Sequence, residues 1–362
     1  MPALVRTVLL GNSFASRVQL PALRWAGGAE VVGIAGADAR KAARTAREWS
    51  IPHATDAWRD LLELDPDLVI VTTPVHLHAP MVLAALETRA AILCEKPFAL
   101  EAGEARVLAD RAAGRLALID HQLRWSPWRR RMSQLVREGF LGRPWSAEVT
   151  MRDGSKKRIA APYSWWYDAE RGGGTLGAIA SHMIDALCVD FGPIESVRAR
   201  LVTYVRERTD ESGEPHSVTA DEHATLWLHT HGGASVTVDA NLMAPASAHG
   251  SWIEYVGDEG TLRLENETRL VSARLGETPR EIDVPAPLPS FEELGLADVG
   301  IFARVLPLYL RDVVRAVAEG ASELPGAATF ADGLATLRVL DAARRSSLEE
   351  AWVPCSPRAT AE

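Results

Sequence analysis

One stretch of the chain places titratable side chains just after a run of glycines. In GGGTLGAIASHMID, from Gly172 to Asp185, three glycines precede an apolar run that reaches His182 and then Asp185. An imidazole can carry a proton near neutral pH, and a carboxylate one helical turn away can orient it. His182 and Asp185 are therefore candidates for a proton-transfer site. An amphipathic core helix whose histidine only hydrogen-bonds is the alternative interpretation.

A second stretch places a lysine at the end of an apolar run. In ILCEKPFAL, Lys96 follows a predicted strand and precedes Pro97. A single lysine is generally a solvated surface charge, but folds with parallel sheets bind their ligands at the carboxyl ends of strands. Because X-Pro bonds adopt cis far more readily than other peptide bonds, we predict a cis Lys96–Pro97 bond that aims the lysine into the cleft.

Composition limits the class of protein. The length of 362 residues predicts two domains, and 47% apolar residues suffice for their cores. A formal net charge of -9 with scattered basic residues argues against nucleic-acid binding, and no stretch is apolar enough to span a membrane. Cys94, Cys188 and Cys355 lack metal-ligand spacing and cannot all pair internally. We therefore expect a reducing compartment, the cytoplasm, and no metal site.

The first third of the chain alternates short apolar runs with helical patterns. This alternation predicts an α/β domain over residues 1–122, a Rossmann-type doubly wound parallel sheet with helices on both faces. We expect strands at Val5–Leu10, Glu30–Ala35, Leu68–Thr72, Ala91–Cys94 and Leu116–Ile119, and helices at Ser16–Trp25, Arg40–Trp49, Ala79–Glu87 and Ala102–Ala113.

The pattern changes from about Trp125 onward. Alternating runs such as SVRARLVTYV and ATLWLHT, separated by Gly, Asp and Glu turns, predict a large, mainly antiparallel open sheet. We expect an α+β domain over residues 123–350 and a C-terminal tail at 351–362. Within this domain we expect a surface loop at Thr278–Leu296 and helices at Phe302–Ala318 and Ala328–Ser346.

The loop after the first strand matches a dinucleotide-binding turn only in part. In VLLGNSFAS, Gly11 takes the first glycine position of G-x-G-x-x-G, but Ser13 and Ser16 replace the other two glycines. A serine adds a Cβ where pyrophosphate approaches, and also a hydroxyl that can donate to phosphate. The helix that begins near Phe14 still offers N–H groups to an anion. A plain strand-to-helix turn without a nucleotide is the alternative.

The end of the second strand bears on the choice between NAD and NADP. An NAD enzyme usually has an acidic side chain there, which accepts hydrogen bonds from the ribose hydroxyls. In GIAGAD that position is Gly36, and Asp38 comes two residues late. Arg40 and Lys41 stand where a 2′-phosphate could be met. The expected cofactor is therefore NAD or NADP, with a slight preference for NADP.

Taken together, these motifs resemble the Gfo/Idh/MocA family, the oxidoreductases named for glucose-fructose oxidoreductase and inositol dehydrogenase. The resemblance covers nearly the whole length, including HQLRWSPWRRRMSQLVREGFLG and FADGLATLRVLDAARRSS. The specific pattern is Glu95-Lys96-Pro97 combined with the glycine triplet and with His182-x-x-Asp185.

The resemblance implies an NAD(P)-dependent dehydrogenase or reductase that acts on CH–OH groups. Lys96 matches a lysine near the nicotinamide and the substrate hydroxyl, where an ammonium lowers the pKa of an alcohol or polarises a carbonyl. Lys96 and His182 are then the catalytic residues, with Asp185 orienting His182. The expected cofactor-binding residues are Gly11, Ser13, Phe14, Ala15, Gly36, Arg40, Thr72, Thr73, Pro74, His78, Glu95, Lys96 and Gln122.

A sugar or cyclitol is the substrate that the resemblance implies. Trp165, Trp166 and Tyr167 precede the glycine triplet, and aromatic faces suit the C–H faces of a sugar ring. Arg124 can bond hydroxyl groups, and His182 is expected to contact the substrate as well. Packing within the core or an oligomer is the alternative for these aromatic residues. The family's sheet often carries a dimer or tetramer contact, so a homodimer or homotetramer is expected.

The chain departs from the family pattern at one acidic position. Many members have an aspartate four residues before the histidine, where this chain has Ala178, and Ala180 replaces the glycine of that motif. A family branch with a Ser-His pair, like Ser181-His182, shares this departure. Lys96 and His182 must then share the proton chemistry. Two alternatives are a catalytically silent dinucleotide-binding sensor and a scaffold of the same fold without a cofactor.

Overall fold

The computed structural model describes residues 4–154, 160–244, 250–296 and 300–355. Contacts within the chain divide it into two compact units. The first unit contains the chain up to residue 99 together with 103–125 and 287–333, and the second unit contains 100–102, 126–286 and the chain from residue 334 onward. None of the described helices is long and apolar enough to cross a membrane.

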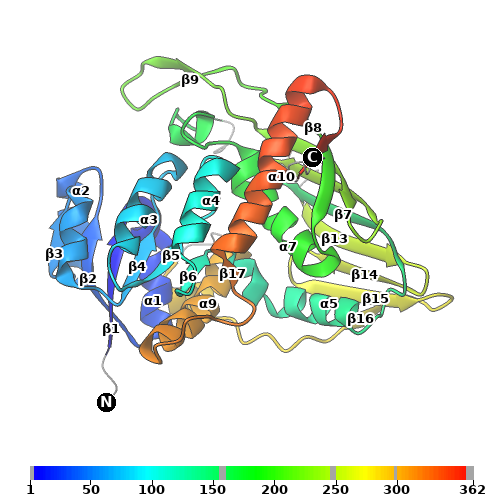
Figure 1. The fold of residues 1–362 in the computed structure, drawn as a ribbon, viewed down its shortest axis with the longest axis horizontal. Helices are drawn as coiled ribbons and strands as arrows, with labels where there is room; N and C mark the ends of the chain where they lie inside the picture. Colours follow the sequence, from blue (N-terminus) through cyan, green and yellow to red (C-terminus); the bar gives the residue numbers. More distant parts are fainter. Residues whose placement is uncertain (1–3, 155–159, 245–249, 297–299, 356–362) are drawn as a thin grey trace, which may run out of the picture. The chain divides into compact units, whose positions relative to one another are not determined.

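A seven-stranded sheet forms the centre of the described part of the first unit (Figure 1). Its strand order is β17-β6-β5-β4-β1-β2-β3, and β17 alone among these strands runs antiparallel to its neighbour. The strands are β1 (Val5–Leu10), β2 (Ala29–Ala35), β3 (His53–Thr55), β4 (Leu68–Val71), β5 (Ala91–Cys94), β6 (Ala117–Ile119) and β17 (Ala328–Thr329). All four residues of β4 are buried, as expected for a parallel strand that is covered on both faces.

Helical segments connect these strands, and capping explains where one of them begins. Helix α2 starts after Asp38, whose carboxylate accepts the N–H groups of Arg40 and Lys41, and it ends at Ser50 in the left-handed conformation. The helices are α1 (Leu20–Ala26), α2 (Ala39–Trp49), α3 (His78–Leu86), α4 (Ala102–Arg111), α8 (Phe291–Leu294) and α9 (Ile301–Ala318). Shorter turns are η1 (Ala15–Gln19), η2 (Trp58–Leu64), η3 (Val75–Leu77) and η4 (Gln122–Trp125).

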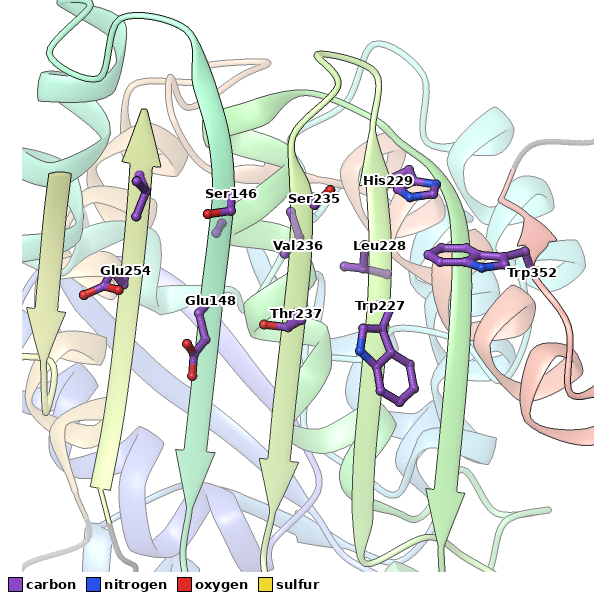
Figure 2. A pocket seen from close by; sticks show the side chains of 12 residues that line it. Ser146, Glu148, Trp227, Leu228, His229, Ser235, Val236, Thr237, Glu254 and Trp352 are labelled. Carbon is purple, nitrogen blue, oxygen red and sulfur yellow. The ribbon is translucent and has the colours of Figure 1, made fainter. Parts of the chain in front are cut away.

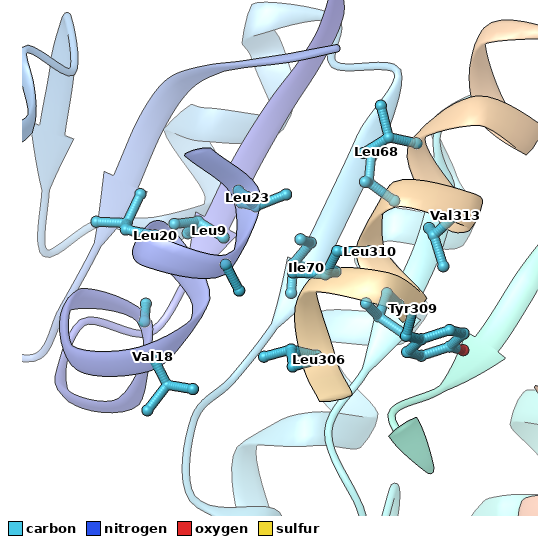
Figure 3. Close-up of a cluster of buried hydrophobic side chains, with 14 of the residues drawn as sticks. Leu9, Val18, Leu20, Leu23, Leu68, Ile70, Leu306, Tyr309, Leu310 and Val313 are labelled. Carbon is cyan, nitrogen blue, oxygen red and sulfur yellow. The ribbon is translucent and has the colours of Figure 1, made fainter. Parts of the chain in front are cut away.

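Helix α9 belongs to the core of the first unit. Leu306, Tyr309 and Leu310 are fully buried and pack in one cluster with Leu9 and Ile70 from the sheet (Figure 3). The Tyr309 hydroxyl also donates to the Ile119 carbonyl oxygen at 3.0 Å. Residues 287–333 therefore group with the Rossmann-type sheet, although we expected them in a second domain over 123–350.

The second unit is built on a nine-stranded sheet within its described residues. The order is β16-β15-β14-β13-β7-β12-β11-β8-β18, and β7 and β12 form a parallel pair in an otherwise antiparallel sheet. The strands are β7 (Pro144–Arg152), β8 (Ile194–Val202), β11 (His223–Thr230), β12 (Ser235–Asn241), β13 (Gly250–Gly257), β14 (Gly260–Glu265), β15 (Arg269–Arg274), β16 (Arg280–Ile282) and β18 (Val353–Pro354).

One face of this sheet packs on helices and the other is more exposed. Along β11, Leu226 and Leu228 are buried, whereas Trp227 and His229 between them are exposed. The remaining elements are the hairpin β9 (Glu207–Thr209) and β10 (Pro215–Ser217), with α5 (Pro127–Arg137), η5 (Trp165–Tyr167), η6 (Leu176–Ala180) and α7 (Ser181–Phe191). Helix α10 (Phe330–Glu349) starts in the first unit and continues in the second.

The predicted fold class is confirmed: a Rossmann-type parallel sheet is followed by an α+β unit with a large, mainly antiparallel sheet. Three local expectations differ from the structure. The expected loop at Thr278–Leu296 contains β16 and α8. The segment before the third predicted strand forms β3 and η2, which we did not predict. The start of the expected tail pairs with β8 through β18, and residues 356–362 lie outside the described part.

Candidate functional site

Four loops of the first unit meet at the carboxyl edge of its sheet. They follow β1, β4, β5 and β6, and backbone hydrogen bonds tie each of them to a neighbouring strand. Thr72 N–H donates to the Leu10 carbonyl oxygen at 2.8 Å, and Glu95 N–H donates to that of Val71 at 2.9 Å. Strand order reverses between β1 and β4, which is the point where such sheets bind ligands. The expected ligand site of the first unit is therefore at this edge.

The Gly11 loop has the close backbone approach that a dinucleotide turn needs. Gly11 has a φ of +127°, and a Cβ built on it would lie 2.5 Å from the Thr72 carbonyl oxygen. Ser13 is exposed at the start of the helical segment, and Phe14 and Ala15 follow in its first turn. N–H groups in a first helical turn lack intrahelical acceptors, so this loop can present donors to a phosphate.

Buried polar atoms around this edge fit a polar ligand. Asn12 Oδ1, Thr72 Oγ1 and Gln122 Oε1 are buried and have no hydrogen-bond partner among the described residues. They come from the loops after β1, β4 and β6. A buried acceptor without a partner is costly, and a bound dinucleotide with its hydroxyl and amide groups can satisfy it. The residues present here therefore fit such a cofactor.

The loop after β2 does not offer a free acidic side chain at its end. A Cβ on Gly36 would lie 2.8 Å from the Asn12 Cβ, which explains the small residue there. The Asp38 carboxylate instead accepts Arg40 N–H at 2.9 Å and Lys41 N–H at 3.1 Å. These bonds, led by the one from Lys41, lower the pKa of Asp38. Arg40 and Lys41 are themselves exposed.

His78 joins two of the four loops. Its Nε2 lies 2.8 Å from the Thr73 carbonyl oxygen and its Nδ1 lies 2.9 Å from that of Pro97. Burial lowers the pKa of His78 to about 4, so the ring is neutral at pH 7 and donates to one of these two carbonyls at a time. The predicted cofactor ligand thus holds the Thr72-Thr73-Pro74 loop against the turn that carries Lys96.

Lys96 stands among acidic groups at the carboxyl end of β5. The Lys96–Pro97 bond is cis, as predicted. Gln19 Nε2 donates to Glu95 Oε1 at 3.3 Å. Desolvation lowers the pKa of Lys96, whereas the charges of Glu95 and Asp120 act to raise it. Desolvation also raises the pKa of Glu95, against the opposing charge of Lys96.

Asp120 is a candidate site residue that the sequence patterns did not identify. It follows β6 directly, is fully buried, and its N–H donates to the Cys94 carbonyl oxygen at 2.8 Å. Desolvation and the nearby Glu95 charge raise the pKa of Asp120 well above its usual range. An acidic residue at the end of the apolar run LALID, at a strand's carboxyl end, was the available signal.

The glycine triplet of the second unit packs against protein backbone. A Cβ on Gly173 would lie 2.3 Å from the Trp166 carbonyl oxygen, and Gly174 N–H donates to that oxygen at 3.0 Å. Gly174 has a φ of +108°, and a Cβ on it would lie 2.4 Å from Asp221 Oδ1. Gly173 and Gly174 are thus explained by their close approaches to the tryptophan segment and to Asp221.

His182 and Asp185 lie on helix α7, which continues directly from the π-helical turn η6. Both side chains are buried. Arg129 on α5 is a basic group that interacts electrostatically with Asp185, and Arg129 also pairs with Glu267 at 2.6 Å. His182 is thus a buried histidine on a helix, three residues before an aspartate that interacts with Arg129. This placement fits both a proton carrier and a core histidine.

The predicted substrate residues have different surroundings. Trp165 and Trp166 are half-buried and meet edge to face with 5.9 Å between ring centroids. Tyr167 is buried, and the Arg208 guanidinium lies 4.2 Å from its ring centroid, so packing accounts for this ring. Arg124, in the first unit, lies 3.4 Å from Asp332.

A depression of about 400 Å³ lies on the exposed face of the second unit's sheet (Figure 2). Trp227 and Glu148 project into it, and at its edge Trp352 stacks on His229 with 4.3 Å between ring centroids. None of the residues predicted to bind cofactor or substrate lines it. Among the described residues, no cluster of three or more His, Cys, Asp and Glu side chains could hold a metal ion.

Two family models match the chain. The oxidoreductase family with an NAD-binding Rossmann fold matches residues 5–119, and the GFO/IDH/MocA C-terminal domain matches residues 129–263. Glucose-fructose oxidoreductase domain-containing protein 2 from Xenopus laevis is 30% identical over 363 residues, which cover 95% of this chain and 92% of that protein. Levoglucosan dehydrogenase from Pseudarthrobacter phenanthrenivorans is 28% identical over 348 residues, 88% of each chain.

Solved structures match over the full length. An oxidoreductase domain protein from Kribbella flavida has a TM-score of 0.86 and 28% identity, with 99% of this chain and 100% of that chain covered. A levoglucosan dehydrogenase in complex with NADH and L-sorbose has a TM-score of 0.85 and 25% identity, with 98% and 99% covered. That relative was solved with NADH bound. The NADP preference expected from Arg40 and Lys41 thus receives no support.

Proposed function

The chain belongs to the GFO/IDH/MocA family of NAD-binding oxidoreductases, and on this premise we propose that it oxidises a secondary alcohol, or reduces a ketone, of a sugar- or cyclitol-like substrate. The observation that carries the proposal is the position of Lys96, next to Glu95 and Asp120 at the ligand-binding edge of the Rossmann-type sheet. The sugar class is supported by the similarity to a levoglucosan dehydrogenase.

In the proposed reaction, residues of this chain bind the cofactor, stabilise charge on the substrate oxygen and transfer the hydroxyl proton. The Gly11 loop and Gln122 would hold the cofactor, which when bound supplies the hydride acceptor or donor. Lys96 would bond the substrate oxygen and stabilise negative charge there, aided by a pKa that desolvation lowers. His182 would take the hydroxyl proton on oxidation and return it on reduction, with Asp185 as its orienting partner.

We propose NAD rather than NADP as the cofactor. The proposal is supported by the match to the family model with an NAD-binding Rossmann fold and by the solved relative in complex with NADH. Titration of the purified protein with NADH and with NADPH, followed by tryptophan-to-nicotinamide energy transfer, tests this. Tighter binding of NADH supports the proposal, and tighter binding of NADPH contradicts it.

A turnover assay tests the reaction itself. The purified chain is incubated with NAD and a panel of levoglucosan, hexoses and inositols, and with NADH and L-sorbose or inosose, while absorbance of the reduced nicotinamide is followed. Steady turnover with one of these polyols or ketoses supports the dehydrogenase. Tight NADH binding without turnover on any of them favours the sensor, for which Ala178 is the motivating departure.

We also propose a homo-oligomer that forms through the exposed face of the second unit's sheet. Trp227 and Trp352 are 40% and 42% exposed there, which is unusual for side chains of this size. Light scattering on the wild type and on Trp227→Lys tests this: the wild type should have at least twice the mass of one chain, and the variant should dissociate. A monomeric wild type would contradict it.

A further inference from the structure

We propose that Asp221 is a positioning residue for His182, because its carboxylate and carbonyl hold the start of the helical segment that carries this histidine. The inference rests on the proposed function only in giving His182 a role in proton transfer. Asp221 lies between β10 and β11, far from His182 in sequence, and none of the family motifs includes it.

Asp221 contacts the start of the helical segment twice. Leu176 N–H donates to Asp221 Oδ2 at 2.8 Å, and Thr175 N–H donates to the Asp221 carbonyl oxygen at 2.9 Å. N–H groups at a helix start lack intrahelical acceptors, so Asp221 supplies acceptors for two of them that the helical segment cannot provide. A carboxylate at this end also interacts favourably with the helix dipole.

The third glycine of the triplet makes this contact possible. A Cβ on Gly174 would lie 2.4 Å from Asp221 Oδ1 and 3.3 Å from its backbone nitrogen. Any side chain at position 174 would push the carboxylate away from Leu176. The contact between Asp221 and the helix start therefore requires a glycine at position 174.

Because the helical segment is continuous, the position of its start at Leu176 fixes the position of His182. Residues Leu176–Ala180 form a π-helical turn and Ser181–Phe191 continue as α7 with no break between them. His182 is six residues after Leu176, about 9 Å along a helix axis. The His182 side chain is buried. A shift of the helix start therefore moves the imidazole within the packed interior, where it has little room to reorient.

The charges around Asp221 leave the carboxylate able to titrate near neutral pH. The charge of Arg344 on α10 acts to lower the pKa of Asp221, and Arg344 is itself paired with Asp341 at 2.8 Å. The neighbouring Glu222 is paired with Arg208 at 2.6 Å. Desolvation raises the pKa of Asp221 to about 6. The ionised form, the better acceptor for Leu176 N–H, therefore dominates above this pH.

The test compares Asp221→Asn and Asp221→Ala in the full chain. Asparagine keeps an acceptor oxygen without the charge, whereas alanine removes both. Asp210→Asn is the matched control, because Asp210 also accepts backbone N–H groups, from Ser212 and Glu214, but is on the exposed β9–β10 turn. The readouts are amide hydrogen exchange of peptides covering 174–184, NADH affinity, and kcat and KM against pH.

We expect amides at 174–184 to exchange about tenfold faster in Asp221→Ala than in the wild type. kcat should fall between about tenfold and a hundredfold, with NADH affinity unchanged. Asparagine, like the protonated carboxyl group, is uncharged, so the kcat of Asp221→Asn at pH 8 should lie well below that of the wild type. The ratio of the two kcat values should approach one as the pH falls below about 6, where Asp221 is protonated. Asp210→Asn should match the wild type throughout.

Two results would overturn the inference. One is unchanged exchange at 174–184 in a folded Asp221→Ala variant. The other, which remains decisive if the alanine variant does not fold, is an Asp221→Asn variant whose kcat equals that of the wild type at both pH 8 and pH 5. Amide hydrogen exchange can be measured without a substrate. It therefore still tests the role of Asp221 if the turnover assay identifies no substrate. Full activity of His182→Asn would refute the proposed role of His182 instead.

Discussion

Gln19 donates a hydrogen bond from Nε2 to Oε1 of Glu95, 76 residues later in the chain, at 3.3 Å. Gln19 is fully buried in the helical segment after the Gly11 loop, and Glu95 immediately precedes Lys96. This bond connects the predicted dinucleotide loop to the predicted catalytic turn inside one unit. A displacement of the Gly11 loop therefore also displaces the Lys96 turn, and the reverse. For variants in either segment, cofactor binding and turnover must both be measured.

Lys96→Ala should lower kcat strongly, and much more than it weakens NADH binding. The ammonium is the group expected to stabilise charge on the substrate oxygen, and loss of such a group lowers kcat by about a hundredfold or more. Kinetics on the substrate identified in the panel, with NADH titration, measure the two effects. Lys41→Ala, which removes an exposed lysine of the same unit, is the control and should keep wild-type kcat with NADH. A Lys96→Ala variant with undiminished kcat would remove this lysine from the mechanism.

Gly11→Ala should lose NADH affinity and stability. The added Cβ would lie 2.5 Å from the Thr72 carbonyl oxygen, so the loop must move away from β4. Gly27→Ala is the matched control, because Gly27 also has a positive φ of +71° but has no heavy atom within 4 Å of the added Cβ among the described residues. The backbone of Gly27, with φ +71° and ψ 175°, is one that other residues rarely adopt, so Gly27→Ala should cost about 1 to 3 kcal/mol in stability but leave NADH affinity unchanged. Equal effects of the two substitutions on affinity would contradict a specific role for Gly11.

Glu222→Gln should destabilise the second unit strongly. Its carboxylate pairs with Arg208 at 2.6 Å, and the two side chains are only 5% and 3% exposed. Removing one charge leaves the other buried without compensation, at a cost of about 3 kcal/mol or more in the free energy of unfolding. Urea unfolding measures it. Glu259→Gln breaks an exposed pair with Arg274 and should cost less than about 1 kcal/mol. Similar costs for both variants would show that burial of the first pair is unimportant.

The stability of the wild type should fall relative to Asp221→Asn as the pH rises from about 4 to about 7. Desolvation raises the pKa of Asp221 from 3.8 to about 6, so the folded state binds the proton more tightly than the unfolded state. Its contribution favours folding fully below pH 3.8 and is lost as the pH passes 6. The difference between the two pKa values limits the relative change to about 3 kcal/mol. Urea unfolding at pH 4, 6 and 8 measures it, and a pH-independent difference would exclude the shift.

Activity and stability are thus expected to depend on Asp221 in opposite directions. The ionised carboxylate destabilises the fold but is the better acceptor at the helix start. Such opposition is common at functional sites, where a costly arrangement persists because it positions a reacting group. The pH profiles of kcat and of the free energy of unfolding, measured on the same two proteins, reveal whether this holds here.

Local sequence patterns were enough to predict much of the first unit. Strands β1 and β5 have the predicted bounds, and the Lys96–Pro97 bond is cis as predicted. Short, strongly apolar runs between helical patterns are local signals, and proline restricts its own peptide bond. The residues that follow these strands could therefore be identified as candidates from the sequence alone.

Long-range contacts decided the rest, because sequence periodicity shows which residues are buried but not what they pack against. Helix α9 was predicted as a helix, yet only its packing on Leu9 and Ile70 assigns it to the first unit. Asp120 and Asp221 are single acidic residues whose proposed roles depend on neighbours far away in the chain. The neighbour of Asp120 is Glu95, and that of Asp221 is Leu176. Desolvation and hydrogen bonding act through space, so their effect on a carboxylate exists only once the tertiary structure has formed.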